Sequence, residues 1–481
     1  MIHRVCLLVI LGTLIVSACG PQALTTANGQ SIGLQDCVLS APRVEEQIDA
    51  KCGSLAVAED RSNPQGRTLT LNIAVVPSIK RNPEPDPLFI LVGGPGQSAV
   101  ETYPLMAPTL FGIHEERDIV LVDQRGTGKS NPLRCLDPED ETLEDDQIVP
   151  LLKTCPDKLD ADLRFYTTDI AMQDLDQVRS ALGYNQINLY GVSYGTRAAL
   201  VYLKMYPEHV RSAVLDAVVD PAFVLYQDVA EDGQKSLESF FARCEADAAC
   251  NNAFPALKSE FEEVLRSVEE KPVDITIPHP VTGRPTDLTV TSIFLSNIIF
   301  NTLYAPDLVA MLPLAIHQAY EADNYAPLIT QAFLLDAGIY DGMLYAVACA
   351  EDAPLITLPE NTSGIFGDGA KLFVEVCKAW PHVDPPTVVH EPVSSDVPVL
   401  MLSGEADPIT PPWHAQQLAT SLRNSLHLIF KNMGHGNSES NCASKILDKF
   451  FETASVQDLD TSCTKDIEPP PFFVDFSGPQ P

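Results

Sequence analysis

The chain has 481 residues, of which 45% are hydrophobic, so it is long enough for a single large core with an insertion or for two domains. Its formal net charge of -34 at pH 7 argues against binding to nucleic acid or to an anionic membrane through charge, because phosphate contacts require a basic surface. What remains is an acidic globular protein whose function must be sought in local motifs.

The N-terminal residues indicate export. Arg4 precedes an apolar stretch over residues 5–16, which is short for a membrane-spanning helix and predicts a signal peptide over 1–18. Val16-Ser17-Ala18-Cys19 resembles a bacterial lipobox, in which the cysteine becomes a lipidated N-terminus. We therefore expect a protein held in the cell envelope only by a lipid on Cys19, at the outer membrane in a Gram-negative organism, and otherwise a secreted protein.

Apolar strand-like runs then alternate with helical stretches. The runs cover 68–76, 89–92, 119–122, 187–189 and 213–215, and a helix is expected over 169–182. This alternation predicts an α/β fold with a mostly parallel, doubly wound sheet and helices on both faces. It stops after Asp220, and strand character returns near Val397. We expect core segments over 19–220 and 391–465, a mainly helical lid over 221–390 and a proline-rich tail over 466–481.

A glycine-rich turn, Gly93-Gly94-Pro95-Gly96, follows the strand that ends at residue 92. Side chains in this turn would keep a substrate carbonyl away from backbone N–H groups, so the turn suits an oxyanion site. We expect the N–H groups of Gly94 and Tyr194 to form that site. Asp123 and Arg125 follow the strand over 119–122, and we expect them to brace the turn without taking part in the chemistry.

Tyr190-Gly191-Val192-Ser193-Tyr194-Gly195 lies between an apolar run and a helix-compatible run over 196–206. A strand that turns directly into a helix forces the intervening serine into strained backbone angles, and only small neighbours leave room for the turn. This is the arrangement of a nucleophile elbow. Ser193 is therefore the expected nucleophile.

Two later strand ends supply an acid and a base. Asp407 follows the apolar run over 397–403, and His435, flanked by glycines, follows the run over 426–430. The chain order of serine, acid and histidine is that of the catalytic triad in α/β-hydrolases. Asp407 and His435 are the expected partners of Ser193, whereas His414 is expected to lie in a loop or on a helix surface.

Two of the twelve cysteines, Cys6 and Cys19, lie in the signal region, which leaves ten. An even number in an exported chain predicts disulfide bonds. Pairing by proximity, with the connectivity left open, suggests Cys37 with Cys52, Cys135 with Cys155, Cys244 with Cys250, Cys349 with Cys377, and Cys442 with Cys463. Because no Cys-x-x-Cys or His-Glu-x-x-His spacing occurs, the sequence predicts no metal site, and it indicates no cofactor.

Together, these motifs resemble the proline iminopeptidase and tripeptidyl aminopeptidase family of serine hydrolases. The resemblance rests on the segments 92–96, 123–130, 191–195, 402–411 and 434–436, and on Cys442 with Cys463 in the style of the tripeptidyl-type C-terminal region. Proline iminopeptidases usually carry histidine before the glycine-rich turn, where this chain has Val92. That difference favours the tripeptidyl branch.

The resemblance implies an α/β-hydrolase fold whose lid recognises the free amino end of a peptide. A buried carboxylate would pair with the substrate ammonium. Glu351 and Asp352, beside Cys349 in the lid, are the candidates for this role.

The expected function is that of a serine hydrolase of the aminopeptidase type, of tripeptidyl or prolyl specificity, that acts on short peptides through an acyl-enzyme. An alternative is a carboxylesterase or lipase-type enzyme with the same triad, since one elbow serves both chemistries on this fold. A third hypothesis is a surface lipoprotein that binds ligands without catalysis. The intact set of Ser193, Asp407 and His435 argues against it.

Overall fold

The computed structural model describes residues 32–41, 44–137, 145–280, 283–332, 338–358, 364–367, 369–381 and 383–479. The predicted signal peptide over 1–18 and the lipid site at Cys19 lie outside these residues. Within them, no helix is both long and apolar enough to cross a membrane.

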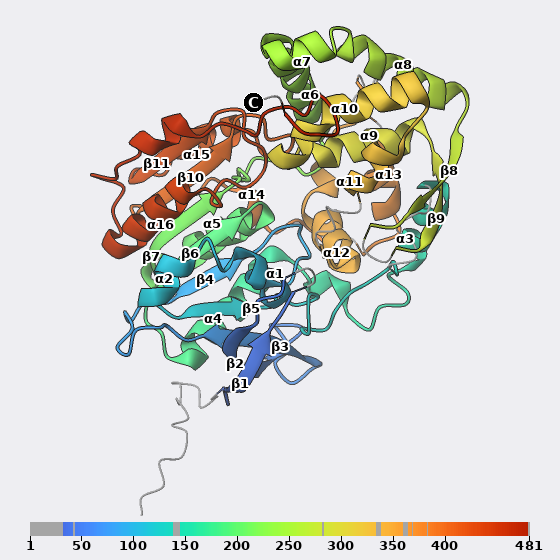
Figure 1. Ribbon diagram of the computed structural model, residues 1–481. Helices are drawn as coiled ribbons and strands as arrows, with labels where there is room; N and C mark the ends of the chain where they lie inside the picture. The colour runs from blue at the N-terminus through green and yellow to red at the C-terminus, as the bar shows by residue number, and fades with distance from the viewer. Residues whose placement is uncertain are drawn as a thin grey trace, which may run out of the picture.

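A nine-stranded sheet forms the centre of the molecule (Figure 1). Its strand order is β1-β2-β3-β5-β4-β6-β7-β10-β11. The bounds are β1 (Gln35–Leu39), β2 (Ile48–Ala58), β3 (Thr68–Val76), β4 (Leu88–Leu91), β5 (Ile119–Val122), β6 (Ile187–Val192), β7 (Val210–Asp216), β10 (Val399–Gly404) and β11 (Ser425–Phe430). From β5 to β11 all neighbours pair in parallel, so the predicted α/β class with a mostly parallel sheet is confirmed.

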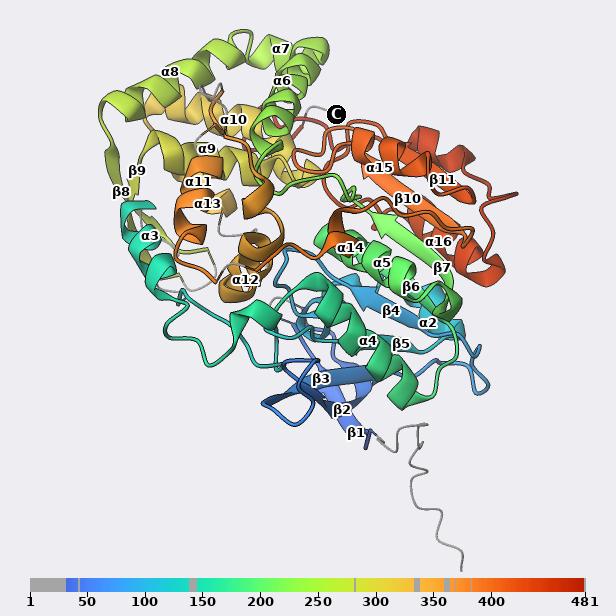
Figure 2. The same cartoon turned by 180° about the vertical axis from the view of Figure 1, so that it is seen from behind.

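The parallel strands are buried on both faces, as their apolar runs indicate. Alternate residues of β10 point to opposite faces: Val399 and Met401 belong to one core cluster, and Leu400 and Leu402 belong to the other. Helices α1 (Ala99–Met106), α2 (Phe111–Glu116) and α16 (Asn441–Thr453) cover one face, and α4 (Thr168–Leu182), α5 (Tyr194–Met205), α14 (Thr387–His390) and α15 (Pro412–Ala419) cover the other (Figure 2).

The sheet has an antiparallel edge, which the sequence pattern does not predict. Strands β1 and β2 pair with each other, and β2 pairs with β3. Much of β1 and β2 is exposed, and their residues mix charged and small types, so they lack the apolar runs that mark the central strands.

The lid lies over the carboxyl ends of the parallel strands (Figure 1). It contains α6 (Val229–Ala246), α7 (Ala248–Ala253), α8 (Leu257–Glu270), the hairpin of β8 (Val273–Pro278) and β9 (Pro285–Val290), α9 (Ser292–Thr302), α10 (Pro306–Ala322), α11 (Ala326–Ala332), α12 (Asp341–Glu351) and α13 (Gly369–Cys377). Helix α3 (Asp145–Thr154) contacts α13 from the core side. Helices α6 to α11 share a core of their own, whereas α12 and α13 pack into the core on one face of the sheet. The lid is mainly helical, as the sequence predicts.

Five disulfide bonds join the ten cysteines in the neighbouring pairs that the sequence suggested. They are Cys37–Cys52, Cys135–Cys155, Cys244–Cys250, Cys349–Cys377 and Cys442–Cys463. Each closes a short loop, of between 6 and 28 residues in sequence separation, so each constrains local structure and none ties the lid to the sheet.

The C-terminal tail packs against the lid. Phe472 is only 4% exposed and lies edge-on to Phe240 of α6, and the Phe473 N–H donates to the carbonyl oxygen of Ala310 in α10. The tail therefore contributes to the core of the lid.

Candidate active site

Ser193 occupies the sharp turn between β6 and α5. Its backbone has φ 56° and ψ -126°, a left-handed strain that a serine adopts only where its surroundings enforce it. A Cβ at Gly195 would collide with the carbonyl oxygen of Leu91, and one at Gly191 would collide with that of Gly195. The glycines are required for this close packing, as expected of a nucleophile elbow.

Asp407 and His435 are paired directly. Asp407 Oδ2 lies 2.8 Å from His435 Nδ1, so this ring nitrogen carries the proton when the pair is hydrogen-bonded and the imidazole is neutral. The N–H groups of Ile409 and Thr410 each donate to Asp407 Oδ1 at 2.9 Å, and the Thr410 hydroxyl donates to Oδ2 at 2.7 Å. These bonds fix the carboxylate and leave His435 Nε2 available for a serine hydroxyl.

Asp407 and His435 each shift the pKa of the other. Burial alone would lower the pKa of His435, but the charge and hydrogen bond of Asp407, with a contribution from Asp216, outweigh burial and raise the pKa above its ordinary value. Burial alone would raise the pKa of Asp407, but His435 and the backbone donors lower it. Asp407 therefore stays ionised and stabilises a protonated His435.

Asp216, at the end of β7, connects the nucleophile to the base. Its carbonyl oxygen accepts the Ser193 N–H at 2.9 Å, and its carboxylate accepts the N–H groups of Asn437 and Ser438, just after His435, at 2.9 to 3.0 Å. Tyr190 of β6 donates its hydroxyl to the same carboxylate at 3.0 Å. No direct hydrogen bond joins Ser193 to His435 within the described residues, and such bonds often tighten only with substrate bound.

The lid also contacts the base. The Tyr304 carbonyl, just after α9, accepts the His435 N–H at 2.8 Å, and the Tyr304 ring centroid lies 4.9 Å from that of His435. Burial and nearby Asp407 raise the pKa of the Tyr304 hydroxyl well above its usual value, so it remains protonated. The lid therefore helps to set the position of His435.

Gly94 and Tyr194, the expected oxyanion residues, line the same small cavity as Ser193. Its volume is about 20 Å³, and Pro95, Arg197, Val219, Phe223, Leu225, Ile409 and Thr410 complete its described walls. Tyr194 is the first residue of α5, so its N–H lies at the positive end of the helix dipole. This placement suits the stabilisation of a developing oxyanion. That the N–H groups of Gly94 and Tyr194 bind the oxyanion stays a prediction.

Asp123 braces the oxyanion turn, as expected, whereas Arg125 acts elsewhere. Asp123 accepts the Ser98 hydroxyl and the Val100 N–H immediately after the glycines. Arg125, with 0% exposure, pairs with Asp174 of α4 and donates to the Phe165 carbonyl, so it anchors that helix to the sheet.

Glu351 and Asp352, the candidates for pairing with a substrate ammonium, are both buried and already have partners from the core. Asp352 accepts two hydrogen bonds from Arg197, at 2.9 and 3.1 Å, and Glu351 accepts the N–H and hydroxyl of Thr168. Neither is among the described residues that line the cavity, where Arg197 stands in front of them. Burial raises the pKa of Glu351 to about 7. The sequence pattern could not reveal that a lid acid would be neutralised by an arginine of α5.

His414 is also placed differently from expectation. It is 0% exposed, stacks on Trp413 and lies edge-on to Phe223, and burial lowers its pKa to about 4. It is therefore a neutral core residue. No group of three or more histidine, cysteine, aspartate or glutamate side chains within the described ranges is arranged to hold a metal ion.

The fold and this site define a serine hydrolase. Residues 86–441 match the model of the alpha/beta hydrolase fold family, about three quarters of the chain, and the chain belongs to that family. The α/β-hydrolase fold that the motifs imply is thereby confirmed.

Its relatives include peptidases and an esterase. Serine protease Hip1 of Mycobacterium tuberculosis is 28% identical over 454 residues, which cover 85% of this chain and 85% of that protein. Tripeptidyl aminopeptidase of Streptomyces lividans is 25% identical over 469 residues, covering 88% of this chain and 85% of the relative. Carboxylesterase B of Mycobacterium tuberculosis is 27% identical over 224 residues, covering 42% and 43% of the two chains.

Asp216→Asn is expected to lower kcat by about 10- to 100-fold with little change in KM, because an amide accepts fewer hydrogen bonds and loosens the His435 loop. Steady-state kinetics on any turned-over substrate measure the change. Asp118→Asn is the matched control, since Asp118 likewise accepts a backbone N–H, from Ser78, and a tyrosine hydroxyl, from Tyr184. Equal kcat losses in both variants would show that Asp216 has only a general structural role.

Proposed function

We propose that this protein is a serine aminopeptidase, of the tripeptidyl or prolyl type, that cleaves short peptides from their free amino end. The two relatives that match along most of the chain are named as a serine protease and a tripeptidyl aminopeptidase. The observation that carries the proposal is the confinement of Ser193. Its cavity has room for only a small group, and Phe223 and Leu225, at the entry to the lid, form part of its wall. A nucleophile in a narrow cavity beside the lid favours chain ends over the middle of a folded polypeptide.

The reaction would proceed in two steps. His435 Nε2 removes the proton from Ser193 Oγ as this oxygen attacks the scissile carbonyl, and His435 then gives the proton to the leaving amine. The N–H groups of Gly94 and Tyr194 stabilise the tetrahedral oxyanion, at about 3 kcal/mol for each donor. Water, deprotonated by the same histidine, hydrolyses the acyl-enzyme and regenerates Ser193.

Carboxylester hydrolysis is the second candidate. The apolar side chains of Val219, Phe223 and Leu225 line the cavity, and no carboxylate is among its described lining residues. An ester substrate needs no partner for an ammonium group, and one relative of part of the chain is named as a carboxylesterase.

We further propose that the mature chain begins at a lipidated Cys19 in the cell envelope. Five disulfide bonds support an oxidising compartment of this kind. Radiolabelled palmitate that enters the wild type but not Cys19→Ser would support the anchor, and equal labelling of the two would refute it.

Cleavage of coumarin amides with aminoacyl, prolyl and tripeptidyl groups, each with a free or a blocked amino end, tests the function beside simple acyl esters. We expect cleavage of amides with a free amino end only, and a loss of at least about 10³-fold in Ser193→Ala. Ser444→Ala, which removes a hydroxyl bonded to the Thr109 carbonyl, is the control and is expected to retain activity. Turnover of esters alone would replace the aminopeptidase with an esterase.

A further inference from the structure

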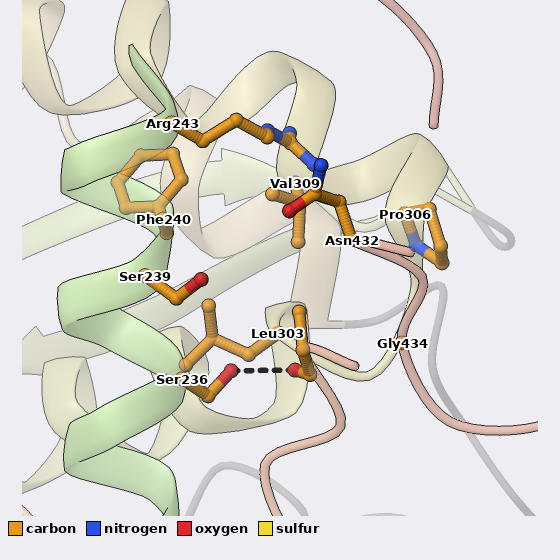
Figure 3. Close-up of a pocket in the computed structure, with 10 residues that line it drawn as sticks. Ser236, Ser239, Phe240, Arg243, Leu303, Pro306, Val309, Asn432 and Gly434 are labelled. Atoms are coloured by element: carbon orange, nitrogen blue, oxygen red, sulfur yellow. Dashed lines mark hydrogen bonds between the residues drawn. The ribbon is translucent and has the colours of Figure 1, made fainter. Parts of the chain in front are cut away.

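A second small cavity lies where lid helix α6 meets the two loops that carry Asp407 and His435. Figure 3 shows its lining side chains, with α6 at the left and the histidine loop at the right. Ala406 and Gly434, which immediately precede the acid and the base, form part of its wall, and Leu303 and Pro306, on either side of Tyr304, form another part. The lining residues are Ser236, Ser239, Phe240, Arg243, Leu303, Pro306, Val309, Ala406, Asn432 and Gly434. The cavity thus touches the loops of Asp407 and His435 and the lid turn that contains Tyr304.

The guanidinium of Arg243 is a positive charge at this cavity, and no acidic residue is among the described residues that line the cavity. Its Nη2 atom is buried and has no hydrogen-bond partner within the described part of the chain. Its guanidinium lies 4.2 Å from the centroid of Phe472, so the tail covers one face of the group. Burial lowers the pKa of Arg243 to about 10, opposed only by the charge of Asp247, whose carboxylate accepts the Cys250 N–H. At neutral pH the group therefore remains a poorly compensated positive charge.

The other polar groups around the cavity are neutral. Ser236 donates its hydroxyl to the Ala406 carbonyl at 2.7 Å, which already joins α6 to the acid loop (Figure 3). Asn432 reaches toward Arg243 from the histidine loop in the same view, and Ser239 lies on the α6 side. None of the described lining residues is acidic. A guanidinium with neutral hydroxyl and amide neighbours has the chemistry of an anion site.

The size of the cavity limits its occupant. Its volume is about 20 Å³, and a cavity needs about 10 to 15 Å³ to hold one water molecule. A monoatomic anion is a group of roughly that size. A buried charge without a partner is costly, and a monoatomic anion would remove that cost.

We propose that this cavity is a binding site for one monoatomic anion of the chloride class, held by Arg243 between α6 and the acid and histidine loops. The anion would compensate the charge of the guanidinium. It would thereby add a second interaction between α6 and the two catalytic loops, beside the hydrogen bond from Ser236 to Ala406. Its effect would be to stabilise the docked lid against the part of the core that carries Asp407 and His435.

Thermal unfolding in a series where chloride replaces gluconate at constant ionic strength tests this proposal. We expect the melting temperature of the wild type to rise along a saturable curve by about 1 to 2 °C. Arg243→Met keeps an unbranched side chain over Phe472 and removes the charge. The melting temperature of this variant is expected to stay unchanged when chloride replaces gluconate. Arg423→Met is the matched control, because the Arg423 side chain is 77% exposed; it is expected to respond like the wild type.

Crystals of the wild-type protein grown with bromide give a second measurement that does not depend on a variant folding. An anomalous peak beside Arg243 Nη2 would support the proposal. A water molecule there without anomalous signal, or a wild-type melting temperature that does not distinguish chloride from gluconate, would overturn it. An equal chloride response in Arg243→Met would place the anion elsewhere and would also overturn it.

Discussion

The site depends on one residue at the end of β7. The main chain of Asp216 holds the nucleophile through the Ser193 N–H, while its carboxylate holds the backbone immediately after His435. Because β6, β7 and β10 are parallel neighbours, their carboxyl ends lie at one edge of the sheet, and a carboxylate at the middle strand can reach both flanking loops. Burial raises the pKa of Asp216, a cost that its backbone donors and the Tyr190 hydroxyl partly offset.

The lid is part of the same arrangement and does more than cover the cavity. Tyr304 binds the backbone of His435, and Asp352, at the end of α12, pairs with Arg197 of the nucleophile helix. Both links are buried, so a movement of the lid would have to break an ion pair and a hydrogen bond that hold catalytic segments. Opening of the lid and order within the triad are therefore expected to be coupled.

The sequence was sufficient for features that depend on local pattern. The central parallel strands carry uninterrupted apolar runs, and Gly191 and Gly195 around Ser193 mark a strand–turn–helix junction, so both could be predicted. Features that depend on partners distant in the sequence could not be predicted. Asp216 acts through residues more than 200 positions away, Asp352 is paired with Arg197, and Glu351 accepts hydrogen bonds from Thr168. The buried state of His414 likewise depends on Phe223 from the lid entry.

The pairing of Asp407 with His435 is the central claim, and the pH dependence of kcat/KM tests it most directly. Catalysis requires neutral His435, so activity rises as pH passes through its pKa, and the raised pKa places that rise above the ordinary histidine value of about 6.5. Removing the charge in Asp407→Asn is predicted to move the acidic limb to lower pH and to reduce the plateau. An acidic limb at the same pH in both proteins would contradict the account.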